Sequence, residues 1–284
     1  MTATRQSPRG LPPWIRAVLA LDRAVEAAAG RVAALRDELL LAWVAPERRD
    51  SITEALYAIQ ASYAPGGNTY EQGLFDWEQA ALEHAAFPRR GRVLVGGAGG
   101  GRELAALRAR GFEVVGFDPC EPLVQRGRAS LGAEGPLPFL RGSYDDLVRA
   151  ARGEPSSLAP LLAHAPFDAV ILGWGSFSYL GSRDEALALL RALRQLAPAA
   201  PVLASFLRPH EEEPSAMRRR VRRLFARLGA PARALPGDAF TPWAGFHRVT
   251  ALDEIPPLAA QAGYEVLVLR AGWYAHALLR PKDG

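Results

Sequence analysis

The chain has 284 residues, of which 49% are hydrophobic, and this content is enough to bury a large core. Its net charge is +4, but nearly all of the positive charge is arginine, beside abundant alanine, glycine and proline. This bias is typical of GC-rich coding sequences, and we favour that explanation over attraction to anionic partners. A single cysteine excludes an internal disulfide, and neither a signal peptide nor a membrane-spanning run is evident, so we expect a cytoplasmic protein without membrane association.

The first predicted helix follows Pro12 and Pro13 and carries apolar residues at alternating spacings of four and three. The series consists of Trp14, Val18, Leu21, Val25, Ala28, Val32, Leu35, Leu39 and Ala42. This is the heptad pattern of helices that pack along their length. We favour packing within its own domain, because Gly30 and the alanines weaken the stripe. The alternative is a helix hairpin or a contact between two copies, so a homodimer through the N-terminal helices stays open.

Two more helices are predicted before the first strand. Pro46 begins one of them, and the segment 64–68 forms a loop after it. Its predicted apolar face consists of Ile52, Leu56, Ile59 and Tyr63. The other helix is predicted from Tyr70 to Ala86. We therefore expect residues 1–90 to form an N-terminal helical cap and residues 91–284 to form a second domain.

A glycine-rich stretch follows a short apolar run at residues 93–95. The glycines are Gly96, Gly97, Gly99, Gly100 and Gly101, and a helical pattern begins at Glu103. A strand, a glycine turn and a helix in this order open a nucleotide-binding βαβ unit. Glycine suits the turn because the chain reverses sharply there and backbone N–H groups must approach a ligand closely.

Strands and helices alternate through the rest of the chain. The further predicted strands cover residues 112–117, 137–140, 167–172, 201–206, 264–270 and 273–279. The last two are joined by only Ala271 and Gly272, so they must form an antiparallel hairpin. Ser182 and Glu185 form a predicted capping box for one helix. This order predicts an α/β fold with a doubly wound, mostly parallel, Rossmann-like sheet, whose ligand lies beyond the carboxyl ends of the strands.

Asp118 ends the second predicted strand, about twenty residues after Gly97, where a carboxylate accepts hydrogen bonds from the hydroxyls of an adenosine ribose. Two classes of cofactor are compatible with this residue. A nicotinamide site needs a small residue at the end of the pattern G-x-G-x-x-G, where Arg102 stands. The spacing G-x-G-x-G fits Gly97, Gly99 and Gly101 instead, so a dehydrogenase is disfavoured.

On these motifs, from Arg92 to Leu279, the chain resembles the class I S-adenosylmethionine-dependent methyltransferases. The resemblance implies that Gly97, Gly99 and Gly101 hold the methionine part of S-adenosylmethionine and that Asp118 holds its ribose. It further implies a set of residues beside the adenine, the sulfonium and the substrate, namely Pro119, Ser143, Tyr144, Gly173 and Trp174.

One position departs from the family. Asp or Glu commonly stands where this chain has Val95, two residues before Gly97, and that carboxylate helps to hold the cofactor's amino group. Valine has no hydrogen-bonding side chain, so backbone carbonyls of the glycine loop or Glu103 would have to compensate. The same departure leaves open a protein that binds the cofactor without catalysis.

Methyl transfer needs a nucleophile in line with the sulfonium, a way to lose a proton, and exclusion of water. His210, just past the fifth predicted strand, and Tyr70, in the segment before the first, are the candidates for an assisting base. A solvated loop histidine or a packing tyrosine is the alternative explanation for each. Tyr63, Trp174 and Tyr179 are the candidates for an aromatic wall around the substrate.

The predicted helix 215–228 is rich in arginine, and a loop rich in proline and glycine follows it up to Phe246. Its arginines occupy the solvent side of an amphipathic helix without interleaved aromatic residues, which disfavours nucleic acid as a partner. No metal is expected, because no His, Cys, Asp and Glu residues have metal-ligand spacing. The sequence therefore predicts methyl transfer from S-adenosylmethionine to a small-molecule acceptor, by O- or N-methylation. RNA or protein methylation and a non-catalytic cofactor-binding scaffold are the alternatives.

Overall fold

The structure is a computed structural model that describes residues 11–132, 138–209, 216–232 and 234–282. The chain divides into two compact units, Met1–Val44 with Pro214–Arg233, and Ala45–Glu213 with Ala234–Gly284. The division after Val44 differs from the boundary expected near residue 90, because the helices of residues 45–90 belong to the unit that contains the sheet.

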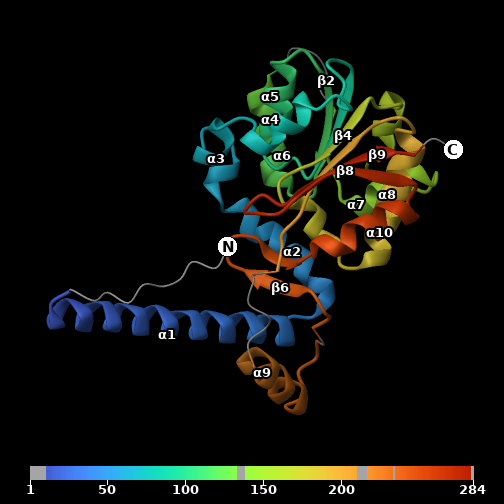
Figure 1. The fold of residues 1–284 in the computed structure, drawn as a ribbon. Coiled ribbons are helices and arrows are strands. Elements are labelled where there is room, and N and C mark those ends of the chain that lie inside the picture. Colours follow the sequence, from blue (N-terminus) through green and yellow to red (C-terminus); the bar gives the residue numbers. More distant parts are fainter. Residues whose placement is uncertain (1–10, 133–137, 210–215, 233, 283–284) are drawn as a thin grey trace. The chain divides into compact units, whose positions relative to one another are not determined.

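The described residues of the larger unit form a seven-stranded sheet (Figure 1). Its strands are β1 (Arg92–Gly96), β2 (Glu113–Asp118), β3 (Phe139–Arg141), β4 (Ala169–Leu172), β5 (Val202–Ser205), β8 (Tyr264–Arg270) and β9 (His276–Pro281). Their order is β3-β2-β1-β4-β5-β9-β8, in which β1 to β5 are parallel and β8 and β9 form an antiparallel hairpin. The predicted doubly wound, mostly parallel sheet is therefore confirmed.

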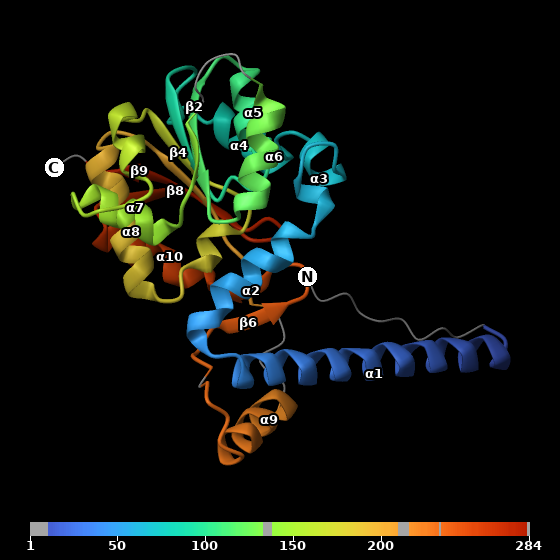
Figure 2. The ribbon, with the colours of Figure 1, turned by 180° about the vertical axis from the view of Figure 1, so that it is seen from behind.

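Helices cover both faces of this sheet (Figures 1 and 2). The longer helices of the unit are α2 (Pro46–Ala58), α4 (Asp76–Glu83), α5 (Arg102–Arg108), α6 (Glu121–Leu131), α7 (Tyr144–Ala151), α8 (Arg183–Leu196) and α10 (Ile255–Gln261). The shorter helical elements are η1 (Ala61–Tyr63), α3 (Asn68–Glu71), η2 (Ala159–His164), η3 (Ser176–Tyr179) and η4 (Leu252–Glu254). A separate hairpin consists of β6 (Asp238–Thr241) and β7 (Gly245–Arg248).

Alternate side chains of the central strands enter two cores, one on each face of the sheet. Leu94 of β1 belongs to one core, and Val93 and Val95 belong to the other. Val95 is paired in register with Ile171 of β4, and both are fully buried. Strands that are apolar on both faces in this way are typical of a parallel sheet covered by helices on both sides.

Some predicted boundaries are wrong. The predicted helix 70–86 is two helices, α3 and α4, because the chain turns at Gly73, whose φ of +62° is left-handed. The last strand begins at His276 rather than Trp273, so the turn before it is longer than predicted. The segment predicted as a loop before Phe246 contains the β6–β7 hairpin.

The predicted apolar face of α2 is only partly buried, since Ile52, Leu56 and Tyr63 are half-buried. Ile59, just past its end, is 78% exposed, whereas the polar Thr53 is buried. The hydroxyl oxygen of Thr53 accepts a hydrogen bond of 3.0 Å from the backbone N–H of Phe246 in β7. A Cβ at Gly245 would lie 2.6 Å from the same hydroxyl oxygen, so glycine at this position allows the hairpin to approach the helix. The hairpin thus holds α2 by a polar side chain.

The described part of the smaller unit consists of α1 (Pro13–Trp43), α9 (Ala216–Arg227) and the turn after α9. Arg222 forms an ion pair with Glu38, and the backbone N–H of Ala232 donates to the carbonyl of Ala42 over 3.0 Å. These contacts leave most of the heptad stripe exposed, at 45% to 68% for Trp14, Val18, Leu21, Val25, Val32, Leu35 and Leu39. The preferred prediction, that this stripe packs within its own domain, is therefore wrong.

Across the described ranges, the helices do not combine the length and apolar content that crossing a bilayer requires.

Candidate active site

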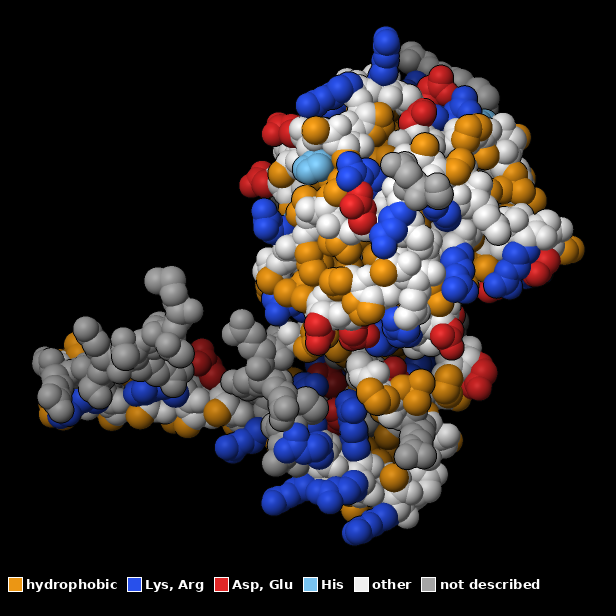
Figure 3. All heavy atoms as spheres, turned by 45° about the vertical axis from the view of Figure 1, so that its right-hand side comes forward, with side chains coloured by type: hydrophobic (Ala, Val, Ile, Leu, Met, Phe, Trp, Pro, Cys, Tyr) orange, Lys and Arg blue, Asp and Glu red, His pale blue; other side chains and the backbone are white. Residues whose placement is uncertain are grey.

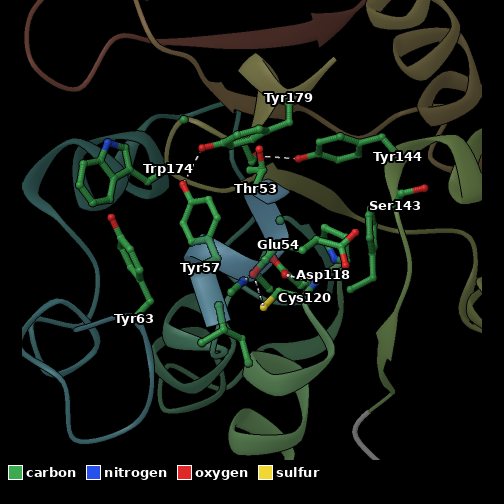
Figure 4. A pocket seen from close by; sticks show the side chains of 18 of the residues that line it. Thr53, Glu54, Tyr57, Tyr63, Asp118, Cys120, Ser143, Tyr144, Trp174 and Tyr179 are labelled. Atoms are coloured by element: carbon green, nitrogen blue, oxygen red, sulfur yellow. Dashed lines mark hydrogen bonds between the residues drawn. The ribbon is translucent and has the colours of Figure 1, made fainter. Parts of the chain in front are cut away.

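A cavity of about 260 Å³ lies in the larger unit, beyond the carboxyl ends of β1, β2 and β4. The loop after β1 contributes Gly97 to its lining, the end of β2 contributes Asp118, and the segment after β4 contributes Trp174. Helix α2 closes another side (Figure 4). The cavity therefore lies where the strand order of a doubly wound sheet changes direction, which is the ligand site of such folds.

The glycine loop has the backbone that the sequence predicts. Gly97, Gly99 and Gly101 all have left-handed φ values, and Gly97 and Gly99 line the cavity. A Cβ at Gly97 would lie 2.4 Å from the Cβ of Ser176, so a larger residue there would displace the turn after β4. Gly101 lies outside the lining and caps the start of α5.

Asp118 connects the glycine loop to the end of β2. One carboxylate oxygen accepts a hydrogen bond of 2.7 Å from the backbone N–H of Gly99, and the other accepts one of 2.9 Å from Cys120. Burial raises the pKa of Asp118 to about 6, against the opposing effect of these two hydrogen bonds. The side chain lines the cavity, and each carboxylate oxygen keeps a second lone pair for a ligand hydroxyl.

The residues predicted to lie beside the adenine all contribute to the wall of the cavity. Pro119, Ser143 and Tyr144 all belong to the lining. The Ser143 hydroxyl caps α7, since it accepts from the backbone N–H of Asp146 and donates to the carboxylate of that residue over 2.9 Å. Tyr144 is buried, and its hydroxyl lies 2.6 Å from the hydroxyl of Ser176. These contacts give both side chains structural partners, so they shape the wall of the cavity.

The turn after β4 places Gly173 against the glycine loop. Its N–H donates to the carbonyl of Gly96 over 2.9 Å, and a Cβ on it would lie 2.6 Å from the carbonyl oxygen of Gly97. Gly173 is outside the lining, but Trp174 directly after it is part of the lining. The absence of a side chain at this position lets the ends of β1 and β4 meet closely.

The predicted substrate residues Tyr63, Trp174 and Tyr179 all line the cavity (Figure 4). The ring centroids of Tyr63 and Trp174 are 6.2 Å apart. The Tyr179 hydroxyl donates to the carbonyl of Ala244 over 2.9 Å and lies 2.5 Å from the hydroxyl of Tyr57. Side chains from η1 and from the segment after β4 are thus brought to one wall.

The structure describes one of the two candidate bases. His210 lies outside the described residues. Tyr70 lines the cavity, and its hydroxyl lies 3.5 Å from that of Ser130, at the solvent side. The geometry places Tyr70 within the site, and its assignment as a base stays a prediction.

Sequence reasoning missed the contribution of α2. Asp50, Thr53, Glu54 and Tyr57 line the cavity from one side of this helix. Their spacing of three, four and seven residues from Asp50 was the available signal, because residues at these intervals share one helix face. The apolar residues Ile52, Leu56 and Ile59 are absent from this lining.

A cluster of buried charged side chains lies directly after the glycine loop. Arg102, the first residue of α5, forms two hydrogen bonds of 2.7 Å to the carboxylate of Glu78, and one of 2.5 Å to Glu103. Its guanidinium carbon lies 4.0 Å from the ring centroid of Phe75. Glu103 also lines the cavity. A carboxylate is therefore present beside the glycine loop although Val95 supplies none.

The cavity is acidic, in contrast to the chain as a whole. Among the described residues that line it are Asp50, Glu54, Glu103, Asp118, Asp145, Glu185 and one cation, Arg102. Because Arg102 is already paired with two glutamates, the site favours a cationic ligand over an anionic one. The described residues contain no group of His, Cys, Asp and Glu side chains arranged to hold a metal ion.

No protein-family model matches the sequence, and no curated protein matches it. Several solved structures share the fold. The PH0226 protein of Pyrococcus horikoshii OT3 has a TM-score of 0.54 and 20% identity, over 80% of this chain and 98% of that chain. DesVI of Streptomyces venezuelae has a TM-score of 0.52 and 14% identity, over 76% and 93%. The third is the 1,6-didemethyltoxoflavin-N1-methyltransferase of Burkholderia thailandensis, with bound 1,6-didemethyltoxoflavin and S-adenosylhomocysteine, at a TM-score of 0.51 and 18% identity, over 84% and 92%.

Identities of this size establish a common fold. The strand order, the closing hairpin and these neighbours together show that the chain has the fold of the class I S-adenosylmethionine-dependent methyltransferases, as the sequence motifs predicted.

The buried charges give a test of stability. Replacement of Arg102 by Met should lower the free energy of unfolding by about 3–5 kcal/mol, because it leaves the fully buried Glu78 without its partner. Burial raises the pKa of Glu78, and Arg102 opposes this, so the pKa should rise further in the variant. A raised carboxyl pKa favours the folded state at low pH, so the loss should be largest in alkaline buffer and shrink on acidification. Urea unfolding at a series of pH values measures this loss of unfolding free energy.

The matched control for this variant is Arg280→Met, which breaks the exposed pair of Arg280 with Glu265 on the terminal hairpin and should cost at most about 1 kcal/mol. An Arg102→Met variant that loses no more stability than this control would contradict the role given to the buried pair.

Proposed function

We propose that this protein transfers a methyl group from S-adenosylmethionine to a small-molecule acceptor bound in the cavity. The observation that carries the proposal is the position of Asp118. Its buried carboxylate lies at the end of β2, is hydrogen-bonded to Gly99 of the glycine loop, and faces the same cavity as the aromatic wall. One space therefore joins a site for an adenosine ribose to a site for a second, aromatic-contacting molecule.

The residues present fit this cofactor. Gly97 and Gly99 line the cavity with left-handed φ values, a Cβ at Gly99 would meet only open space, and acidic side chains suit a sulfonium cation. In the proposed assignment Asp118 holds the ribose, Pro119, Ser143 and Tyr144 flank the adenine, and Gly97, Gly99, Gly101 and Gly173 surround the methionine part. Glu103 binds the amino group of the cofactor, which Val95 cannot do. S-adenosylmethionine supplies an electrophilic methyl group on sulfur.

The chain's own contribution to catalysis is positioning and exclusion of water. Helix α2, the turn after β4 and Trp243 of the β6–β7 hairpin enclose the space where the acceptor meets the methyl group. Burial raises the pKa of Tyr57, Tyr144 and Tyr179, so these hydroxyls stay protonated at neutral pH and orient ligands rather than act as bases. His210 and Tyr70 stay the proposed assisting bases.

The alternatives are less well supported by the geometry. An acidic cavity disfavours RNA as the acceptor, and Arg222 of the arginine-rich helix is already paired with Glu38. A non-catalytic scaffold differs from an enzyme in one measurable respect, because it would bind the cofactor without forming S-adenosylhomocysteine from it in the presence of an acceptor.

Calorimetric titration with S-adenosylhomocysteine tests the ribose assignment. Asp118→Asn should bind it about tenfold or more weakly at neutral pH, because a hydrogen bond to a charged acceptor is stronger than one to a neutral acceptor. In the unmodified protein, affinity should fall as the pH drops below about 6, where Asp118 takes up a proton, and the variant should lack this part of the pH dependence.

Asp253→Asn is the matched control, since it makes the same change at an exposed position outside the cavity and should bind normally. Equal affinity of Asp118→Asn and the control would refute the assignment.

A further inference from the structure

One wall of the cavity consists of five aromatic rings, each next to another. They belong to Tyr179, Tyr57, Tyr63, Trp174 and Trp243, and neighbouring ring centroids are 5.4 to 6.2 Å apart. The rings come from α2, η1, the segment after β4 and the turn of the β6–β7 hairpin. Such a wall presents several π faces to one ligand, and π faces attract both flat rings and cations.

Two polar groups beside this wall, the Tyr57 hydroxyl and the Glu54 carboxylate, can accept hydrogen bonds from a ligand. The single proton of the Tyr179 hydroxyl is donated to the carbonyl of Ala244, so the 2.5 Å contact between the two tyrosines uses the proton of Tyr57. The Tyr57 oxygen is then left to accept from a ligand. Glu54 precedes Tyr57 on the same face of α2, and its carboxylate forms a long ion pair of 3.8 Å with Arg141.

Cations that would hold an anionic acceptor are missing from the described lining. Arg102 is the one basic residue there, and its guanidinium is occupied by Glu78 and Glu103. A carboxylate or phenolate acceptor would therefore enter an acidic site without a counter-ion, which is unfavourable. An amine is favourable at this site, because it donates hydrogen bonds, carries positive charge and is attracted to aromatic faces.

We infer that the acceptor is an amine attached to a flat or aromatic body, which stacks on the aromatic wall while its nitrogen faces Glu54 and Tyr57. This inference rests on the proposed function and names its substrate class. The ammonium form first gives a proton to the Glu54 carboxylate. The freed nitrogen lone pair then forms the new N–C bond, the S–C bond breaks with its electron pair passing to sulfur, and S-adenosylhomocysteine and a methylammonium product result. Glu54, which is 34% exposed, returns its proton to water.

Three probes of equal size and different charge test this inference in the complex with S-adenosylhomocysteine. They are phenethylamine, phenethyl alcohol and hydrocinnamate, each titrated by calorimetry at neutral pH. Phenethylamine should bind about tenfold more tightly than the alcohol, and hydrocinnamate should bind most weakly. Glu54→Gln should remove most of the preference for the amine over the alcohol, whereas the exposed control Glu83→Gln on α4 should keep it.

An amine that binds no more tightly than the alcohol, or a carboxylate that binds best, overturns the inference. Binding of S-adenosylhomocysteine is measured first on the same preparation. Its failure would count against the proposed function itself, whereas a wrong order of the three probes after normal binding counts against the amine alone.

A second inference rests on α1 alone. Its exposed stripe keeps strict heptad spacing from Trp14 to Leu39, and Figure 3 shows apolar side chains recurring along this helix and arginines gathered over α9. Apolar residues at two positions of every heptad let two such helices pack along their length, because side chains of one helix insert between side chains of the other. A second copy of α1 offers that surface.

The charges beside the stripe decide the direction of pairing. In a parallel pair, Arg31 of one copy would lie against Arg36 of the other, and these like charges repel. In an antiparallel pair, Trp14 meets Leu39, Val18 meets Leu35, Leu21 meets Val32 and Val25 meets Ala28, without like charges opposed. We propose that two copies of the chain associate through an antiparallel pair of α1 helices.

Sedimentation velocity over a concentration series tests the association. The full chain should be a dimer, Leu21→Arg should shift it to a monomer, and the matched control Glu26→Arg, off the stripe, should leave the dimer intact. Direction is tested by oxidising mixtures in a Cys120→Ser background. Chains carrying Val18→Cys should crosslink with chains carrying Leu35→Cys and not with themselves. A monomer at all concentrations, including one that binds lipid vesicles or another protein, contradicts the proposal, and so does self-crosslinking.

Discussion

The arrangement of this molecule depends on one buried carboxylate. Asp118 accepts hydrogen bonds from Gly99 and from Cys120, and so fixes the end of β2 to the loop that follows β1. Parallel pairing of β1 with both β2 and β4 brings the three strand ends to one edge, and the hydrogen bond from Gly99 to Asp118 holds the glycine loop at that edge. Burial raises the pKa of this carboxyl to about 6, which makes the site sensitive to mild acid.

Charge is distributed in opposite ways over the chain and its cavity. The chain carries a net charge of +4, yet the described lining is dominated by carboxylates. Arg102 is locked between Glu78 and Glu103, and arginines of α9 belong to the smaller unit. Composition alone thus gives a misleading impression of the ligand, because the sign of the charge at a site is set by the few side chains that face it.

The central sheet and its ligand edge were predictable because they follow from local patterns. Apolar runs such as residues 93–95, the glycine spacing and Asp118 at a strand end each depend on neighbours in the sequence. The spacing of the polar residues of α2 indicates that they share one face, but the burial of Thr53 depends on the distant Phe246 and Gly245 of β7, which local patterns do not reveal. The sequence suggested Glu103 only as one option for compensating Val95, because the position of its carboxylate depends on Arg102, which is held by Glu78, remote in the chain.

The central claim is that the edge formed by β1, β2 and β4 holds S-adenosylmethionine with its methyl group directed at the aromatic wall. A crystal structure of the complex with S-adenosylhomocysteine tests this most directly. We expect ribose hydroxyls hydrogen-bonded to Asp118, the adenine beside Pro119 and Ser143, and the sulfur facing the space in front of Trp174. A ligand bound elsewhere, or one whose sulfur points away from Trp174, would contradict it.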